Sequence, residues 1–299
     1  MVDLDTLAAL DALQWLRTGE EVAKRFPWSE ASVSRYSKQC LDLYGLTMER
    51  VAGEWTLHGD PSLLQLQRQG HQWARWMGRR PLRLEATYWS GPLLCTPTPK
   101  PWLLGLGSIV GVARNLQLVR DRVVDVWLGA LPDLPAADDP ELVAIQLCTM
   151  PVHYLAAPDH PLLRMPRITV EQVAQYPTLA LPDGAYPIVE RSLKGLGLWS
   201  DAVRMQRYDR GAWEGKTETE LTIGYGTVLS HAVSGGQLRF LPLQLPFVSG
   251  EALVLRREFL GQPALRALAH HVLDKLTIWA QTFPEINLVF RPESLDGPA

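Results

Sequence analysis

The segment Ser29–Gly45, SEASVSRYSKQCLDLYG, has the features of a helix that can enter a groove of duplex DNA. Ser29 is a good N-cap and Gly45 a helix stop, so a helix is expected between them. Short side chains in its first turns allow close approach to the major groove, where hydroxyls and guanidiniums bond to phosphates and base edges. The alternative is an ordinary surface helix with a capping serine. The residues expected at the groove are Ser29, Glu30, Ser32, Ser34, Arg35 and Lys38.

The segments before Ser29 place this helix third in a small helical unit. Residues 3–17 carry a leucine at every third position and predict an amphipathic helix, and residues 20–26 predict a short second helix. Pro27 and Trp28 supply a turn before the third helix. Helix, short helix, tight turn and helix are the parts of a helix-turn-helix, in that order.

A two-stranded wing is expected after Gly45. Arg50-Val51 and Trp55-Thr56-Leu57 are the predicted strands, with residues 52–54 at the tip. Wings usually touch phosphate or the minor groove, so Gly53 is included among the candidate DNA-binding residues. The tip carries Glu54 and no arginine, which weakens the expected contact.

Residues 61–79 predict a further helix with an apolar seam. Leu63, Leu66, Trp73 and Met77 lie at the alternating three- and four-residue spacing of a two-helix coiled coil. We therefore expect a dimer contact here. The alternative is a helix packed on its own domain. Gly78 and Pro81 then mark a linker.

From Pro81 onward, strand-like and helix-like segments alternate, which indicates an α/β architecture. Strands are expected at 82–86, 123–127, 142–147, 151–157, 178–181, 203–207, 240–242 and 253–256. Helices are expected at 102–114, 169–175, 188–194, 227–233 and 263–282.

Composition limits the function classes. The 299 residues carry a net charge of −3, so the overall charge gives no support to nucleic-acid binding. No apolar run is long enough to span a bilayer, and the acidic N-terminus is not a signal peptide, so the expected location is cytoplasmic. Cys40, Cys95 and Cys148 are too scattered for a disulfide framework or a zinc site. Buried apolar thiols are expected, with a redox-sensing pair as the alternative.

The sequence offers little for catalysis. No glycine-rich phosphate loop is found, because residues 105–108 are too short and lack the P-loop lysine. The adjacent His270 and His271 point in different directions on a helix, so they cannot share a metal. No nucleophile, base and orienting group can be assembled from local spacing. We therefore expect no catalytic residues, no metal and no cofactor.

Five sequence segments resemble, in the same order, those of the LysR-type transcriptional regulators. Residues 29–35, SEASVSR, are similar to the family's recognition helix, and Gly45 and Met48 follow where the family has Leu-Gly-x-x-Leu-Phe, with one residue missing. HYLAAPDHPL (153–162) resembles the strand and hinge before a His-Pro-Leu. ITVEQVAQYPTLAL (168–181) and SHAVSGGQLRFLP (230–242) resemble later segments. Glu30 stands where the family usually has a glutamine. A side chain that could donate to adenine is thus replaced by one that only accepts hydrogen bonds.

The resemblance implies a winged helix-turn-helix at 1–59, a linker and dimerisation helix at 60–80, and a periplasmic-binding-protein-like effector domain at 81–299. Its lobe I would comprise 82–157 and 248–291, and its lobe II 158–247. The family binds promoter DNA as a dimer of dimers and small metabolites between the lobes. The short stretch 87–122 suggests that one strand of lobe I is absent or irregular. By resemblance, the cleft residues are Thr87, Trp89, Ser90, Trp127, Tyr225 and Thr227.

The sequence therefore favours a sequence-specific DNA-binding regulator, self-associating as a dimer or tetramer and controlled by a small-molecule effector. Two alternatives remain open. One is a solute-binding or enzymatic α/β protein whose N-terminal domain serves only association. The other is a regulator that has lost its response to an effector.

Overall fold

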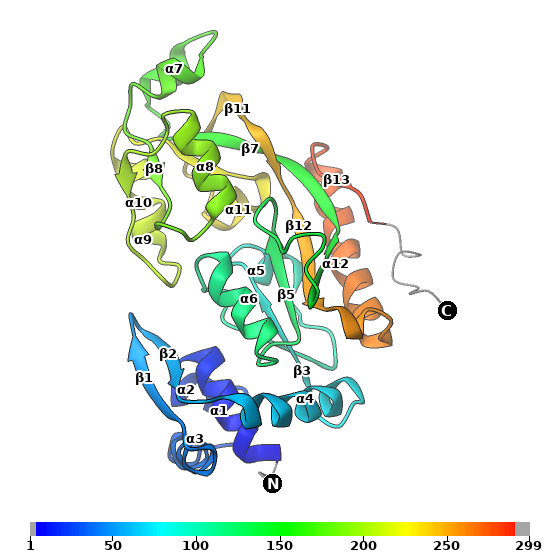
Figure 1. Ribbon diagram of the computed structural model, residues 1–299. Helices are drawn as coiled ribbons and strands as arrows, with labels where there is room; N and C mark the ends of the chain where they lie inside the picture. Colours follow the sequence, from blue (N-terminus) through cyan, green and yellow to red (C-terminus); the bar gives the residue numbers. More distant parts are fainter. Residues whose placement is uncertain (1–3, 291–299) are drawn as a thin grey trace.

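The computed structural model describes residues 4–290, without the side chains of residues 201 and 202. The predicted domain limits at residues 1, 291 and 299 lie outside the described residues. Figure 1 shows the chain in three tiers, with the N-terminal helices and wing at the bottom, a mixed sheet in the middle and a second lobe at the top. The first domain comprises α1 (Leu4–Leu16), α2 (Gly19–Ala23), α3 (Glu30–Tyr44), β1 (Thr47–Val51) and β2 (Glu54–His58), followed by α4 (Ser62–Trp76).

The first domain is the winged helix-turn-helix that the sequence predicts. Ser29 caps α3 by accepting the Ser32 N–H at 3.2 Å, and Gly45 ends the helix in the left-handed region at φ 64°. β1 and β2 pair antiparallel from Thr47↔His58 to Val51↔Glu54. Ala52 and Gly53, at φ 51° and 87°, form the two-residue turn between the strands.

Lobe I is built on a five-stranded sheet in the order β4-β3-β5-β12-β6. β3 runs parallel to β4 and β5, whereas β12 lies antiparallel between β5 and β6. The bounds of its elements are β3 (Leu82–Ala86), α5 (Ser90–Leu94), β4 (Trp102–Leu104), α6 (Val112–Arg120), β5 (Val126–Ala130), β6 (Leu142–Gln146), β12 (Glu251–Arg256), the 3-10 helix η2 (Arg257–Phe259) and α12 (Pro263–Thr282).

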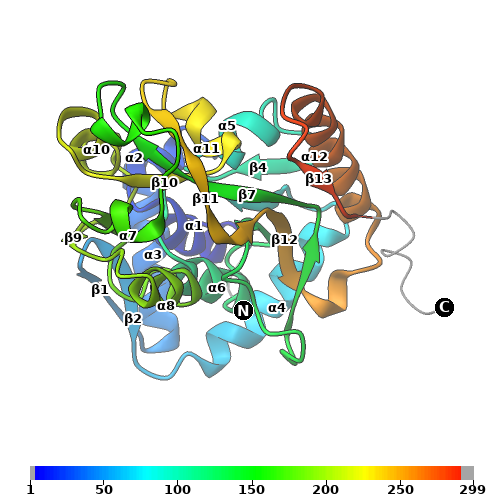
Figure 2. The same ribbon diagram turned by 90° about the horizontal axis from the view of Figure 1, so that it is seen from above.

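Lobe II has a small antiparallel sheet in the order β10-β7-β11, with β13 also paired to β7. The long strands β7 and β11 run between the lobes in Figure 1. Figure 2 shows α12 and β13 at one end of the molecule, and α7, α8 and α10 at the other. The bounds are β7 (Cys148–Ala156), the 3-10 helix η1 (Pro161–Arg164), α7 (Val170–Val173), β8 (Leu179–Ala180), α8 (Pro187–Gly195), β9 (Asp201–Ala202), α9 (Arg210–Trp213), α10 (Gly215–Thr219), β10 (Gly224–Gly226), α11 (Val228–Val233), β11 (Arg239–Ser249) and β13 (Asn287–Leu288).

The two faces of the lobe I sheet contribute to different cores. Val126 and Leu128 point to one face and pack with α5 and α12, whereas Trp127 points to the other. On that second face Trp127 shares a core with α6 and with Trp15 and Leu16 of α1. The winged helix-turn-helix is therefore packed directly on lobe I.

Two predicted elements differ from the structure. Residues 102–114 are not one helix, because residues 102–104 form β4 and α6 begins only after Gly111. The lobe I strand that the sequence suggested to be absent or irregular is therefore present, but three residues long. Residues 203–207 do not form a strand in a sheet. Their pairing is an isolated bridge between Ile109 and Arg207. Among the described residues, no helix is long and apolar enough to cross a membrane.

Candidate functional sites

The outer face of α3 carries the polar residues that the sequence assigns to DNA. Ser29, Glu30, Ser34, Arg35 and Lys38 are exposed, and Ser32 is half-buried. The opposite side of the helix turns Val33, Ser37 and Cys40 into the domain interior. α3 therefore presents to solvent a face with short hydroxyl side chains in its first turns and two cations after them.

The wing tip lies against the effector domain. Figure 1 shows the hairpin pointing from α3 toward lobe II. The Gly53 carbonyl accepts a hydrogen bond from Arg17 Nε at 3.0 Å. Next to it, the Glu54 carboxylate accepts two hydrogen bonds from Arg207, at 2.7 and 2.8 Å. These intramolecular bonds hold the tip, and the DNA contact at Gly53 stays a prediction.

α4 has two different sides. Leu64, Arg68, Gln72, Arg75 and Trp76 are buried against the first domain and lobe I. The predicted dimer seam lies on the other side, where Leu63 is 65% exposed, Leu66 67%, Met77 69% and Trp73 37%. The helix therefore packs on its own chain, as the alternative reading held, and still leaves an apolar stripe in solvent.

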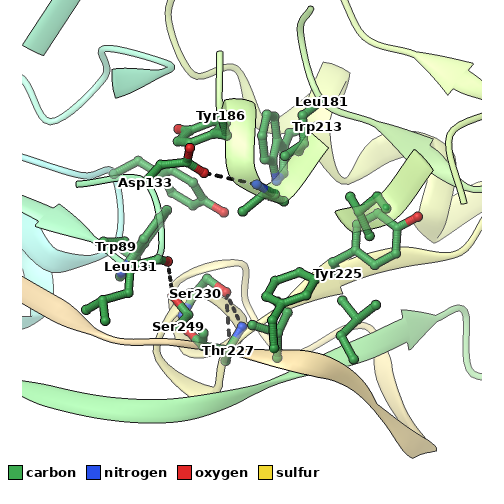
Figure 3. A pocket seen from close by; sticks show the side chains of 18 residues that line it. Trp89, Leu131, Asp133, Leu181, Tyr186, Trp213, Tyr225, Thr227, Ser230 and Ser249 are labelled. Carbon is green, nitrogen blue, oxygen red and sulfur yellow. Dashed lines mark hydrogen bonds between the residues drawn. The ribbon is translucent and has the colours of Figure 1, made fainter. Parts of the chain in front are cut away.

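The interlobe cleft contains a cavity of about 110 Å³ (Figure 3). Lobe I contributes Tyr88, Trp89, Leu131 and Asp133 among others. The described residues that line it include no lysine, arginine or histidine. Its remaining lining is Ala130, Val152, Leu181, Tyr186, Val189, Leu193, Trp213, Tyr225, Gly226, Thr227, Ser230, Leu245, Phe247 and Ser249.

The hydroxyls of this cleft bond mainly to the protein itself. Thr227 and Ser230 form a capping box at the start of α11. Ser249 donates to the Leu131 carbonyl at 3.1 Å, and the Tyr225 hydroxyl donates to the Leu198 carbonyl at 3.0 Å. A ligand in the cleft would therefore meet mostly apolar and aromatic side chains, with few polar groups to fix its orientation.

Contacts between the lobes close the cleft. Tyr88 of lobe I stacks on Tyr208 of lobe II with ring centroids 3.6 Å apart and planes 4° apart. The Asp133 carboxylate accepts the N–H groups of Ile188 and Val189, at 2.7 and 3.2 Å, in the first turn of α8. Burial raises the pKa of Asp133, although these two backbone bonds lower it. The first turn of α8 is thus already occupied by a carboxylate of the protein's own lobe I.

Glu251 lies buried behind the cleft and was not found from the sequence. Its Oε1 accepts a hydrogen bond from Trp89 Nε1 at 2.7 Å, and Trp89 lines the cavity. Burial raises the pKa of Glu251 to about 8, so its carboxyl is largely protonated at neutral pH. The preceding Gly250 and the sequence alternation of β12 gave no indication of a buried acid here.

The predicted cleft residues separate into three groups. Trp89, Tyr225 and Thr227 line the cavity. Thr87 and Ser90 do not line it, because they are buried and bonded to each other, with the hydroxyl oxygens 2.6 Å apart. The assignment of Trp127 is wrong, since strand alternation directs this side chain into the core beneath the sheet, where it is 2% exposed.

The three cysteines lie in apolar surroundings. All are free and buried. Burial raises the pKa of Cys40 and of Cys148 to about 12. Burial raises the pKa of Cys95 as well. A thiol in this state is a poor nucleophile, which supports the structural role over redox sensing.

Comparison with known proteins bears on both domains. Residues 109–209 match the LysR substrate binding domain family. No curated protein matches the chain. A cysteine variant of full-length OxyR from Pseudomonas aeruginosa is 19% identical with a TM-score of 0.57, over 91% of this chain and 95% of that chain. A probable transcriptional regulator from Pseudomonas aeruginosa is 16% identical with a TM-score of 0.54, over 90% and 96%.

The chain consists of a winged helix-turn-helix joined by α4 to a two-lobed α/β domain. The matched residues 109–209 are similar to the LysR substrate binding domain, and the chain as a whole has the fold of full-length OxyR and of the probable transcriptional regulator.

Proposed function

We propose that this protein is a transcriptional regulator that binds duplex DNA through α3 and responds to a small molecule in the interlobe cleft. The observation that carries the proposal is the outward face of α3, where Arg35 and Lys38 follow the serines at 29, 32 and 34, of which Ser29 and Ser34 are exposed. A helix of this kind can reach base edges, while its cations contact phosphates. Glu30 at the helix start would disfavour nearby phosphate and accept from cytosine.

A dimer would place two such helices on successive turns of the double helix. The exposed apolar side of α4 supports self-association, because Leu63, Leu66 and Met77 are each about two-thirds exposed in the single chain. A two-fold arrangement through α4 would bring together two copies of the same stripe. The number of protomers in the active assembly is set by contacts beyond this stripe.

The cleft supports an effector that is small and mainly apolar or aromatic. Its lining offers tryptophan, tyrosine and aliphatic side chains, with no cation among the described lining residues to neutralise an anion. An occupant that separated Tyr88 from Tyr208 would favour a more open arrangement of the lobes. Only a ligand with different affinities for the closed and open arrangements would shift the balance between them.

A mobility-shift assay on the DNA upstream of the protein's own gene tests the DNA-binding part. Arg35→Ala should weaken binding by roughly 5- to 150-fold, corresponding to about 1–3 kcal/mol for a guanine or phosphate contact. Arg167→Ala is the matched control, because Arg167 is an exposed arginine of lobe II, whereas Arg204 shares a groove with the wing. Equal affinity of Arg35→Ala and the wild-type protein would contradict the assignment of α3. Absence of binding to any duplex at low salt would favour the solute-binding alternative.

A further inference from the structure

A second cavity lies between the winged helix-turn-helix and the effector domain. It has a volume of about 130 Å³, similar to the 110 Å³ of the interlobe cleft, and the two share no lining residue. α1 and the turn before α3 form one side, α4 forms another, and residues 80–83 with Leu103 close it. The first domain, α4 and lobe I therefore meet around one cavity that is partly open to solvent.

The wall of this cavity is strongly cationic. Four guanidinium groups line it, and Asp5 is the one carboxylate among the described lining residues. Two of these arginines have near partners at the rim, where Arg25 contacts Glu21 at 2.7 Å and Arg80 contacts Asp5 at 2.8 Å. The other two, Arg75 and Arg83, belong to a deeper network.

The deeper network contains one more cation than it has carboxylates in direct contact. Arg68 contacts Asp11 at 2.8 Å, and Arg75 bonds both oxygens of Asp125, at 2.8 and 2.9 Å. The nearest carboxylate oxygen to Arg83 is that of Asp11, at 3.5 Å, and its shorter bond goes to the Val123 carbonyl at 2.9 Å.

All five side chains of this network are at most 5% exposed. Burial, and then the neighbouring Arg75, lower the pKa of Arg83 to about 10, so this guanidinium is still charged at neutral pH. Arg83 shares the Asp11 carboxylate with Arg68, so its buried charge is only partly compensated, and an anion in the adjacent cavity would add a second counterion.

A flat apolar surface lies beside this charge. Phe26 and Trp28 both line the cavity and stack with centroids 4.9 Å apart and planes 1° apart. The Arg83 guanidinium is 6.0 Å from the centre of the Phe26 ring. The cavity thus offers an aromatic wall at a short distance from Arg83, the cation that shares its carboxylate with Arg68.

We propose that this cavity binds a small organic monoanion, a carboxylate on a flat apolar body, with its charge at Arg83 and Arg80 and its ring against Phe26 and Trp28. A single surplus positive charge fits one carboxylate better than a dianion. The cavity volume is on the scale of a site for one aromatic ring, since cavities of ~150 Å³ take up benzene. A bound molecule would contact the first domain, α4 and lobe I together. Neither DNA binding nor an effector in the interlobe cleft is required for this site to bind an anion.

Isothermal titration of the full-length protein with phenylacetate tests the site, with the uncharged phenylacetamide as the paired probe. Ala8→Leu fills this cavity, and Ala130→Leu makes the same change in the interlobe cleft. We expect phenylacetate to bind the wild type and to lose at least about tenfold in affinity with Ala8→Leu. Ala130→Leu should leave its affinity unchanged, and phenylacetamide should bind at least about tenfold more weakly than phenylacetate.

Arg80→Gln provides a variant that keeps the test decisive if Ala8→Leu does not fold. The Arg80 side chain is 45% exposed, so its replacement should leave the fold intact and weaken phenylacetate roughly fivefold. The proposal is overturned if phenylacetate does not bind, if phenylacetamide binds equally well, or if Ala130→Leu rather than Ala8→Leu removes the binding.

Discussion

Glu54 and Arg207 join the wing tip to lobe II through a two-pronged ion pair. Both oxygens of the carboxylate accept from the guanidinium, at 2.7 and 2.8 Å, and the two side chains are only 14% and 11% exposed. Arg114 of lobe I lies 3.6 Å from the same carboxylate. Arg207 also forms the bridge to Ile109 that connects the two lobes, and Tyr208 next to it stacks on Tyr88. The wing therefore contacts the segment where the lobes meet.

Replacement of this carboxylate should free the hairpin. In Glu54→Gln the guanidiniums paired with this carboxylate lose their counter-charge. The backbone amides of β1 and β2 should therefore exchange with solvent at least about tenfold faster, which corresponds to a decrease of ~1.4 kcal/mol in the free energy of local opening. Hydrogen-exchange mass spectrometry of the 47–58 hairpin measures this effect. Glu49→Gln is the matched control, because Glu49 is exposed on the same hairpin and its ion pair, with His58 at 2.9 Å, stays within the hairpin and does not reach lobe II. Unchanged exchange in Glu54→Gln would show that the ion pair does not hold the wing.

Glu251 should make stability depend on pH. Its pKa is raised by burial from the ordinary value of 4.5 to about 8, so the folded protein holds a proton that the unfolded chain releases between these values. The wild type should therefore lose stability as pH rises through this range, by at most about 1.4 kcal/mol per unit.

Glu251→Gln keeps an acceptor for Trp89 and cannot ionise. Its stability relative to the wild type should rise by on the order of 2 kcal/mol between pH 6 and pH 8, as measured by urea unfolding at each pH. The difference between the two proteins isolates this residue, since the other titrating groups are common to both. A constant difference across the range would mean that Glu251 is ionised in the folded protein.

Trp127 should act in stability and leave the cleft unchanged. Its side chain fills the core between the lobe I sheet, α6 and α1. Trp127→Ala should lower the free energy of unfolding by about 3–5 kcal/mol through lost burial and a new cavity. Trp89→Ala is the comparison, because Trp89 lies at the cleft and is only half-buried. A smaller loss of stability for Trp127→Ala than for Trp89→Ala would contradict this placement.

The exposed side of α4 should govern self-association. Leu66→Glu introduces a charge at a position where the native side chain is 67% exposed, so the stability of the single chain should not change. The dissociation constant of the dimer should rise by at least about tenfold. Sedimentation velocity over a range of concentrations measures this. Ile278→Glu on α12, with the native residue 59% exposed, is the control for a charge on another apolar surface position. Equal association of Leu66→Glu and the wild type would exclude α4 as the contact.

The helix-capping and periodicity patterns of short sequence segments are enough to predict the first domain. Ser29 and Gly45 mark the ends of α3 because each satisfies a backbone requirement of a helix terminus, and these requirements act over three or four residues. The long C-terminal helix was predicted at 263–282, where α12 is found, because its apolar period is regular and Pro263 starts it.

Long-range contacts could not be predicted in the same way. Arg83 and Asp11 are 72 positions apart, and Arg207 and Glu54 are 153 apart, so no periodicity connects them. Trp127 was assigned to the wrong side because both faces of the lobe I sheet are covered, and apolar residues then occupy every position of β5. The cationic cavity depends on the packing of the first domain on lobe I, for which the sequence carries no local signal.

The division of α4 into a packed side and an open side also bears on how the molecule is made. A helix whose burial depended on a second copy would leave each newly synthesised chain incomplete until it met its twin. Here the covered half of α4 finds its neighbours within one polypeptide. The single chain can therefore fold at any protein concentration. Association of two chains through the exposed side of α4 would then be a later, bimolecular step whose extent depends on the concentration of the protein in the cell.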